Sequence, residues 1–445
     1  MKIGLEVHVQ LPTESKLFCS CSTAETEEPN ANVCPVCMGF PGSKPVINEK
    51  ALEYGVLLAK MLGCRIDDTT WFARKIYFYP DNSKNYQTTQ HDRPLGREGV
   101  YYLNGKKPIR ITRIHIEEDP GKTKRVGDSS LIDYNRSGIP LAEIVTEPDI
   151  ATPAEAREFL KQLIQDIRHT IDMSEDGERS IRCDCNISVG KERCEVKNVT
   201  GLRNVEKALT FEAVRQTKLL KAGGKIVRET RHFDEERGVT VSVRKKEMEA
   251  DYGYIDEPDL GVFNVKELVD SLDVKESPQN MILRLAKEYG IDEKTSKQYV
   301  STSVDMAKLF EMLVSVADVE TARKFTSGPI SAGWRSFESD DSKNVDGIVS
   351  IVKEYRDGGI TDVEGNLRIR SYMTGEDMDV ISSGSSNLDE MISEFLDENP
   401  NVIEDYRKND KAANRVIGHV MKQTGGAYSS SDIVEATKRL IGERL

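Results

Sequence analysis

The sequence predicts an α+β protein in which a strand-rich first part precedes a wholly helical second part. Three observations support this prediction. Before residue 275, several stretches alternate apolar and polar residues, as half-buried strands do. From Glu276 to about Glu376, apolar residues recur at helical spacing and strand signals are few. The Ser/Gly-rich run Ser382–Asn387 then precedes a small helical unit, as a flexible linker would. We therefore expect three domains, over residues 1–275, 276–381 and 388–445.

Length and composition limit the class of protein. The 445 residues, 38% of them hydrophobic, suffice for two to three domain cores. No run of 18 apolar residues exists and the first residues show no secretion signal, so we expect a cytoplasmic protein without a membrane span. Eight cysteines in such a chain should be reduced, which favours a metal site over disulfides. The net charge of −13 argues against general coating of nucleic acid but allows a local basic surface.

The first segment of the chain, GLEVHVQL at residues 4–11, predicts a strand with one polar face. Leu5, Val7 and Val9 point one way, and Glu6 and His8 the other. A carboxylate and an imidazole two residues apart on a strand can meet the same ion. A single histidine is more often just a hydrogen-bonded polar residue, and Glu6 beside it makes the two interpretations comparable.

A hairpin is predicted over Ile181–Asn198, with the turn at Gly190-Lys191-Glu192. Cysteine and isoleucine occupy one face of its first strand. The other face gathers acid and amide oxygens, which suit a hard cation, and basic groups, which suit phosphate. An ordinary solvated strand face is the alternative. Because at least three strands place acids on one face, we favour a shared cradle for a metal and a nucleotide. The polar residues concerned are Arg182, Asp184, Asn186, Glu195 and Lys197.

Two close cysteine pairs predict a structural zinc site. They form the pattern C-x-C, twelve residues, C-x2-C, and consist of Cys19, Cys21, Cys34 and Cys37. Four thiolates can close a tetrahedral zinc site and leave no open position, so the ion should staple a loop and not catalyse. The remaining thiols, Cys64, Cys183, Cys185 and Cys194, are expected to be free.

Other elements follow from periodicity and capping. A helix is expected over Lys50–Leu62, and strands over Arg74–Tyr79 and Ile109–Glu117. Thr152-Pro153-Ala154-Glu155 is a capping box that begins an amphipathic helix. The fragment Pro120-Gly121-Lys122-Thr123 lacks the first glycine and the spacing of a P-loop, so we reject that interpretation.

A local basic patch is expected near the end of this acidic chain. It has five cations with Asp410 as the one nearby acid between Arg407 and Gly426. A solvated helix face would explain the same pattern. The cations are Arg407, Lys408, Lys411, Arg415 and Lys422.

Several long motifs carry a resemblance to a known family. GLEVHVQL, RKIYFYPDNSKNYQTTQ, HIEEDPGK, DYNRSGIPLAEIVTEPD, RCDCNIS and EVKN together resemble the GatB/GatE family, the B subunits of GatCAB aminoacyl-tRNA amidotransferases, in its zinc-bearing type. The motifs run in family order over essentially the whole chain. The ending VIGHVMKQTGG and a final helix resemble the YqeY-like tail of that family. The resemblance implies a glutamine-synthetase-like cradle with an antiparallel sheet, an all-α helical domain and a YqeY-like tail.

The resemblance also implies a ligase activity. The family's B subunit uses ATP to phosphorylate the side-chain carboxylate of Asp or Glu misacylated onto tRNA(Asn) or tRNA(Gln). Ammonia released from glutamine by the GatA subunit then displaces the phosphate, and GatC completes the heterotrimer. Since carboxylate and ATP are both anions, divalent ions and cationic side chains must offset their repulsion.

Site residues follow from the resemblance by motif position. Mg²⁺ or Mn²⁺ would be held by Glu6, His8, Glu118 and Glu195, with Glu143 as a further candidate ligand. Asp184 and Asn186 would complete or orient this catalytic set. Lys75, Arg182 and Lys197 would meet the phosphates of ATP, and the basic tail would hold tRNA. Strand alternation favours Glu117 as the ligand, whereas the motif match favours Glu118, and we follow the motif.

The chain departs from the family pattern in one segment, and two other functions would explain parts of the sequence. The family commonly reads DYRYxPEPD, whereas this chain has Gly253 and Asp256 in place of the arginine and the first proline, so we leave this segment out of the catalytic set. A non-catalytic, zinc-stapled tRNA-binding protein would not need the acids. A free-standing amino-acid ligase would not need the basic tail. This chain has both sets of residues.

Overall fold

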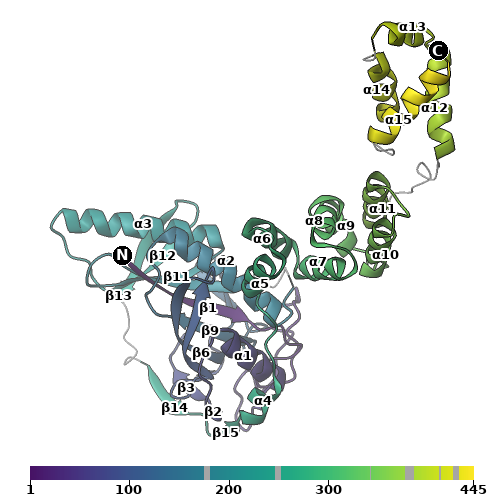
Figure 1. Cartoon of the computed structure of the whole chain (residues 1–445). Helices are drawn as coiled ribbons and strands as arrows, with labels where there is room; N and C mark the ends of the chain where they lie inside the picture. Colours follow the sequence, from purple (N-terminus) through teal and green to yellow (C-terminus); the bar gives the residue numbers. More distant parts are fainter. Residues whose placement is uncertain are drawn as a thin grey trace. The chain divides into compact units, whose positions relative to one another are not determined.

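A computed structural model describes residues 1–174, 181–245, 252–340, 342–375, 385–409, 412–423 and 430–444. The chain divides into two compact units, Met1–Asn280 and Met281–Leu445. The strands of the described residues all lie in the first unit, and the second unit is helical (Figure 1). The predicted α+β class and its order along the chain are therefore confirmed.

An eight-stranded sheet forms the centre of the first unit, in the order β13-β12-β11-β10-β1-β9-β6-β5. Neighbouring strands are antiparallel except β11 and β12, which are parallel. The predicted hairpin over Ile181–Asn198 is present as β10 and β11. The strands are β1 (Lys2–Gln10), β5 (Gly96–Leu103), β6 (Lys107–Glu118), β9 (Pro140–Thr146), β10 (Ile181–Ser188), β11 (Cys194–Thr200), β12 (Glu229–Asp234) and β13 (Val239–Lys245).

One face of this sheet packs into the core and the other is polar. Leu5, Val7 and Val9 of β1 are buried in a single apolar cluster with residues of three helices, α1 (Glu49–Met61), α2 (Pro153–Thr170) and α3 (Leu202–Lys221). Burial of these stripes provides the main stabilisation of the unit. Thr152 caps α2 by accepting a hydrogen bond from the Glu155 backbone N–H, as predicted. The opposite face is left to carry the polar residues.

Smaller sheets stand beside the main one. β3 (Ala73–Ile76) pairs with β4 (Tyr86–Thr89) and β14 (Gly253–Asp256), β2 (Thr69–Trp71) pairs with β15 (Val262–Asn264), and β7 (Lys122–Val126) pairs with β8 (Ser129–Asp133). The strand expected over Arg74–Tyr79 is therefore shorter than predicted. The partner strands β4 and β14 have no residue paired beyond Ile76 of β3, and the following residues Phe78 and Tyr79 are exposed.

The second unit contains two separate apolar cores among its described residues. One core joins residues between Met281 and Met373, and the other joins residues between Leu388 and Ile441. The helices of the first core are α5 (Pro278–Tyr289), α6 (Glu293–Thr302), α7 (Val304–Val316), α8 (Val319–Phe325), a π-helical turn (Thr326–Ile330), α9 (Ser331–Glu338), α10 (Val345–Arg356) and α11 (Asp362–Thr374). Those of the second are α12 (Ser385–Glu398), α13 (Asn401–Lys408), α14 (Ala413–Gln423) and α15 (Ser430–Glu443). One further helix, α4 (Lys266–Ser271), belongs to the first unit.

The linker expected over Ser382–Asn387 is partly wrong. Ser385 already begins α12, whose Leu388, Ile392 and Leu396 are buried at helical spacing. Residues 382–384 lie outside the described residues. Within the described parts of the chain, no helix combines the length and the apolar character needed to cross a membrane.

Candidate metal and nucleotide site

Strand register brings distant polar residues into one row across four strands. His8 of β1 pairs with Arg182 of β10 on one side and with Glu143 of β9 on the other. Glu143 in turn pairs with His115 of β6. Directly paired residues project from the same face of a sheet. The row therefore concentrates imidazole and carboxylate groups on the polar face.

Glu143 lies between His8 and His115 in this row. Its Oε2 atom is 3.3 Å from His8 Nε2 and 3.8 Å from His115 Nε2. His115 Nε2 is also 3.4 Å from Glu117 Oε2. Two triads have ligand atoms within 4.8 Å of one another, Glu6/His8/Glu143 and His115/Glu117/Glu143, and Glu143 belongs to both. Carboxylate-rich triads of this kind suit divalent cations.

Crowding of these groups shifts their titration. Burial, reinforced by the charge of Glu143, raises the pKa of Glu6 to about 7. Burial opposes the charged form of His8, but the hydrogen bond and the charge of Glu143 outweigh it and raise the His8 pKa to about 9. For Glu143 itself, burial is outweighed by the charge of His115 and the hydrogen bond from His8, so its pKa is well below the usual range. Repulsion among carboxylates this close is what a bound divalent cation relieves.

Glu118 lies apart from both triads. Its carboxylate bonds the Lys84 ammonium and accepts a hydrogen bond from the Thr88 backbone N–H at 3.2 Å. Successive residues on a strand face opposite ways, so β6 can present Glu117 or Glu118 to the row, but not both. In this structure Glu117, and not Glu118, lies in a triad that could hold a cation, so the choice of Glu118 as a metal ligand stays a prediction that its position does not favour.

A pocket of about 650 Å³ adjoins the row. Glu6, Asn186 and Glu195 line it, as does Thr230, whose hydroxyl donates a 3.1 Å hydrogen bond to Glu195 Oε2. The buried Asn186 Oδ1 accepts no hydrogen bond from the described residues. A buried acceptor without a donor is costly, so this atom is suited to a ligand that enters the pocket. The cations around the pocket are Lys2, Lys75, Arg113, Lys191, Arg193, Lys197 and Arg228.

Two of the three predicted phosphate-binding cations, Lys75 and Lys197, line the pocket, and the third does not. Burial opposes the charge of Lys75, but the nearby Glu117 and Glu143 outweigh it and raise the Lys75 pKa. Arg182 instead contacts both carboxylate oxygens of Asp119, at 2.8 and 2.9 Å, and is not among the pocket residues. The assignment of Arg182 to phosphate is therefore not supported by its position.

Asp184 is tied to its own hairpin. Its Oδ1 accepts a 2.7 Å hydrogen bond from the Asn198 backbone N–H, and its Oδ2 is 3.4 Å from Lys197 Nζ. It faces Glu6 across the β1–β10 pair. Asp184 is thus positioned to hold the hairpin and Lys197 against the site.

Several residues at the site were not predicted from the sequence. Strand alternation had favoured Glu117, and the motif match displaced it; Arg113 and His115 lie on the same strand as Glu117, each an even number of residues before it, and were not assigned to the site. Tyr252 and Tyr254 line the pocket although their segment departs from the family motif. Lys75 Nζ lies 5.0 Å from the Tyr252 ring centroid, and the Tyr254 ring stacks on His91 at 3.8 Å. Arg193 and Arg228 carried no sequence signal. Arg193 sits in the turn between β10 and β11, and Arg228 precedes β12.

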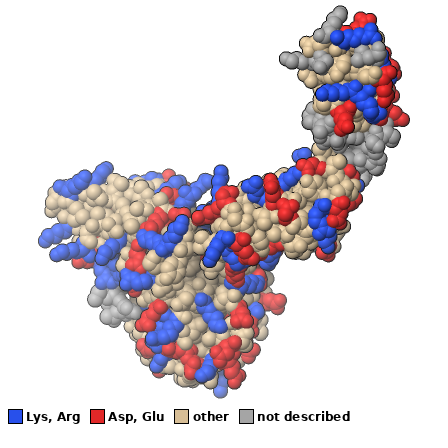
Figure 2. Space-filling view, in the orientation of Figure 1, with Lys and Arg blue, Asp and Glu red and all other residues tan. Residues whose placement is uncertain are grey.

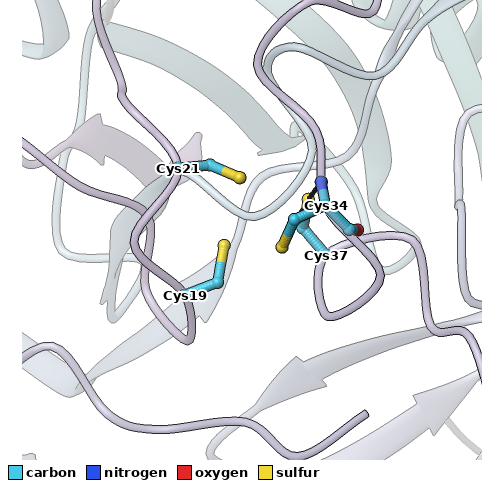
Figure 3. A group of neighbouring side chains, drawn as sticks. All are labelled: Cys19, Cys21, Cys34 and Cys37. Atoms are coloured by element: carbon cyan, nitrogen blue, oxygen red, sulfur yellow. Dashed lines mark hydrogen bonds between the residues drawn. The ribbon is translucent and has the colours of Figure 1, made fainter.

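The four cysteines expected to bind zinc come together (Figure 3). Their sulfur atoms lie within 4.8 Å of one another, and those of Cys34 and Cys37 are 3.9 Å apart. Tetrahedral coordination with zinc–sulfur bonds of about 2.3 Å needs sulfur atoms about 3.8 Å apart, so the cluster fits the ion. A hydrogen bond from the Cys19 thiol, aided by backbone and Lys16 contacts, outweighs burial and lowers the Cys37 pKa to about 5. The other four cysteines are free, as expected.

The expected basic patch near the C-terminus lies on two helices. Arg407 in α13 and Arg415 in α14 are exposed, and Arg415 lies 3.3 Å from Asp405. Lys408 and Lys422 belong to the same two helices, and Lys411 is outside the described residues. On the face shown in Figure 2, basic and acidic side chains alternate over this part of the chain.

Comparison with known proteins identifies the family. The model of the GatB/GatE catalytic domain matches residues 1–270, and that of a GatB domain matches residues 360–441. The chain is 38% identical over 470 residues to a protein of Methanospirillum hungatei JF-1 that is named as the B subunit of an aspartyl/glutamyl-tRNA(Asn/Gln) amidotransferase, covering 100% of this chain and 98% of that protein. Proteins of the same name from Methanococcoides burtonii and Methanobrevibacter smithii are each 39% identical, over 95% and 99% of this chain and 94% and 100% of their own lengths. A catalytic-domain match over more than half of the chain, with full-length relatives of one name, shows that the chain belongs to the GatB/GatE family of amidotransferase B subunits.

Proposed function

We propose that this chain activates the side-chain carboxylate of misacylated tRNA, Asp on tRNA(Asn) or Glu on tRNA(Gln), by phosphoryl transfer from ATP. The observation that carries the proposal is the pocket itself. Glu6, Asn186 and Glu195 lie in it with seven cations, beside two triads that share Glu143. Such a site can hold a polyphosphate and a carboxylate, two anions that otherwise repel each other.

The chain's own residues supply positioning and charge. Lys75, Arg113 and Lys197 line the pocket from three different strands and would contact phosphate oxygens, as would Arg193 and Arg228. Glu6, His8, His115, Glu117 and Glu143 would hold Mg²⁺ or Mn²⁺, with Glu195 as a further ligand at the pocket. An ion held there would supply positive charge that offsets the negative charge of the phosphoryl group. Asp184 keeps Lys197 in place, and the Thr230 hydroxyl orients Glu195.

The reaction then proceeds in two balanced steps. An oxygen of the side-chain carboxylate attacks the γ-phosphorus of ATP, and ADP leaves. Ammonia next attacks the acyl carbon, phosphate leaves with that oxygen, and the nitrogen loses a proton to give the amide. We propose that the ammonia comes from a glutaminase partner, GatA, in a heterotrimer with GatC, and that the complex works in the cytoplasm.

The remaining features have supporting roles in this proposal. The four cysteines hold a structural zinc ion. Residues 276–381 and 388–445 form two helical domains after the cradle of residues 1–275. The last of them binds tRNA through Arg407, Lys408, Lys411, Arg415 and Lys422. This division agrees with the two separate apolar cores of the second unit.

A non-catalytic tRNA-binding protein remains the alternative, and buried acids argue against it. Glu117, Glu143 and Glu195 are each about 95% buried, and a binding protein gains nothing from the cost of burying them. The test is to reconstitute the chain with its partner subunits and supply Asp-tRNA(Asn) and Glu-tRNA(Gln) separately. ATP-dependent formation of Asn or Gln on the tRNA is expected for one or both. tRNA binding without ATP hydrolysis on either substrate would overturn the proposal.

A further inference from the structure

Lys16 is a buried lysine beside the four cysteines. Its side chain is almost fully enclosed, with 1% of the residue exposed. Its ammonium donates to the Asn32 carbonyl at 2.7 Å, to the Tyr134 carbonyl at 3.3 Å and to Cys37 Sγ at 3.7 Å. All three N–H donors are therefore used. Among the described residues, no carboxylate forms an ion pair with this ammonium.

A buried ammonium without a negative partner destabilises the folded state even after the surroundings relax. Carbonyl groups solvate the ammonium but carry no net charge. Of its three acceptors, only Cys37 can ionise. The nearby Glu118 carboxylate already bonds the Lys84 ammonium, which leaves the thiol cluster as the source of the missing charge.

The cluster has the matching surplus. Four thiolates around a divalent ion carry a net charge of about −2 by simple counting. Packing at this point also excludes water. Lys16 is 1% exposed and Cys37 3% exposed. Charges enclosed in this way interact more strongly than charges in water.

We propose that Lys16 is the charge-balancing partner of the metal site, and that its ammonium donates a hydrogen bond to the metal-bound Cys37 thiolate. This inference rests on the proposed zinc ion and does not depend on the proposed phosphoryl transfer. The ammonium offsets half of the net charge of the site. Through Asn32 and Tyr134, it also ties the cysteine loop to the segment after β8.

Zinc retention is the first test. Groups that hydrogen-bond metal ligands commonly change metal affinity by about 10- to 100-fold. Lys16→Met removes the charge and the donors but keeps an unbranched side chain. Zinc release from the full chain to a chromogenic chelator should become about tenfold faster or more. Lys60→Met is the matched control, because Lys60 also donates to a carbonyl, that of Leu272 at 2.6 Å, in the same unit and has no thiol among its acceptors.

Thermal melts separate this role from simple packing. If Lys16 serves the metal-bound thiolate, Lys16→Met should lower the Tm of the zinc-loaded protein more than that of the stripped protein. If Lys16 serves only the two carbonyls, both forms should lose the same amount and the release rate should not change, which would overturn the proposal. Lys60→Met should leave the difference between the loaded and stripped forms unchanged.

A measurement on the unmodified sequence covers the case in which Lys16→Met does not fold. The protein loaded with ¹¹³Cd and labelled with ¹⁵N-lysine should show one slowly exchanging ammonium signal whose protons couple to the metal through the Cys37 sulfur. Absence of such a signal in protein that retains cadmium would also overturn the proposal. The zinc content of the wild-type protein is measured before these tests. A wild-type chain that binds no zinc would refute the zinc assignment itself.

Discussion

His8 Nε2 lies 3.3 Å from Glu143 Oε2, across the register pair that joins β1 to β9. The same carboxylate oxygen lies 3.8 Å from His115 on the next strand. A single central carboxylate thus connects two triads whose members come from three strands. A substitution in either triad should therefore change the position and the charge of Glu143, and through Glu143 the other triad as well.

Glu117 and Glu118 should have separable roles. Glu117→Gln removes a ligand of the His115 triad, so phosphate release dependent on misacylated tRNA should fall about a hundredfold, the scale of about 3 kcal/mol of transition-state stabilisation. Its melting temperature should change little. Glu118→Gln loses the charge that bonds Lys84, so it should cost about 1–3 kcal/mol of stability and keep most of the activity. The reverse pattern in activity and melts would identify Glu118 as the ligand.

Glu195→Gln tests the pocket at nearly constant side-chain size. Glu195 is buried at the pocket wall and accepts a hydrogen bond from Thr230, which a glutamine oxygen can also accept. We expect tRNA binding to persist, and phosphate release to fall by roughly a hundredfold or more, with partial recovery at high Mg²⁺ or Mn²⁺. Filter binding measures the first effect and release of labelled phosphate measures the second, and a thermal melt shows whether the variant is folded. A variant that melts and turns over like wild type would leave Glu195 no catalytic part.

The cysteine cluster should hold about one zinc ion per chain, as four thiolates predict. Replacing Cys34 and Cys37 by serine should lower the metal content and the melting temperature together. The double variant Cys183→Ser/Cys185→Ser is the control, since these thiols lie outside the cluster and should not alter zinc content. Elemental analysis of carefully prepared wild-type protein without zinc would contradict the assignment.

Removal of Leu388–Leu445 should weaken tRNA binding without abolishing ATP binding. The deleted segment has its own apolar core, so the remaining cores stay complete. Binding through phosphates makes affinity fall with salt, and the truncated chain should show a flatter dependence on salt concentration. Filter binding at several salt concentrations measures the slope. An unchanged affinity and slope would identify the basic residues as ordinary solvated surface.

Asp166 should contribute a pH dependence to the stability of the first unit. Burial raises its pKa to about 6, against the hydrogen bonds from Tyr101 and Gln162. A raised folded-state pKa means that the folded protein holds this proton more tightly, so the contribution to stability is full below about pH 4 and is lost as the pH rises through 6. The loss should be about 2–3 kcal/mol from this group.

The variant Asp166→Asn isolates this effect because it cannot titrate. Urea unfolding of wild type and variant at about pH 4.5 and about pH 7.5 gives four free energies of unfolding. The wild type should lose about 2 kcal/mol more than the variant between the two pH values. Parallel losses in the two proteins would mean that Asp166 titrates normally in the folded state.

Local pattern was sufficient for some parts of the site and insufficient for others. Alternation placed Glu6 and His8 on the polar face, and spacing alone assembled the four cysteines, because both signals are short-range. The partner of His8 could not be predicted, since Glu143 lies 135 positions later and only the strand order makes them neighbours. Arg182 shows the same limit. Its strand face was predicted correctly, but its ion pair with Asp119 depends on where β6 ends.

The choice between Glu117 and Glu118 shows how two kinds of inference can conflict. Strand alternation is a physical constraint on each residue, whereas a motif match constrains only the segment. In β6 the physical constraint correctly predicted that Glu117 lies beside His115, while the identity of the metal ligand stays a prediction. The tyrosines at the start of β14 were missed for a different reason. Tyr254 reaches the pocket because β14 pairs with β3, and that pairing joins segments about 180 positions apart.

The row of paired residues also bears on when the site comes into existence during folding. Its members occupy paired positions on neighbouring strands, and the other face of β1 buries Leu5, Val7 and Val9. A shift of β1 by one residue would bury Glu6 and His8 in the core and expose the apolar residues to water. The shifted register is therefore strongly disfavoured. The ligands are consequently spaced as soon as the sheet has formed. A newly folded chain should therefore meet its substrates with the cradle already preorganised, and need not spend binding energy on arranging it.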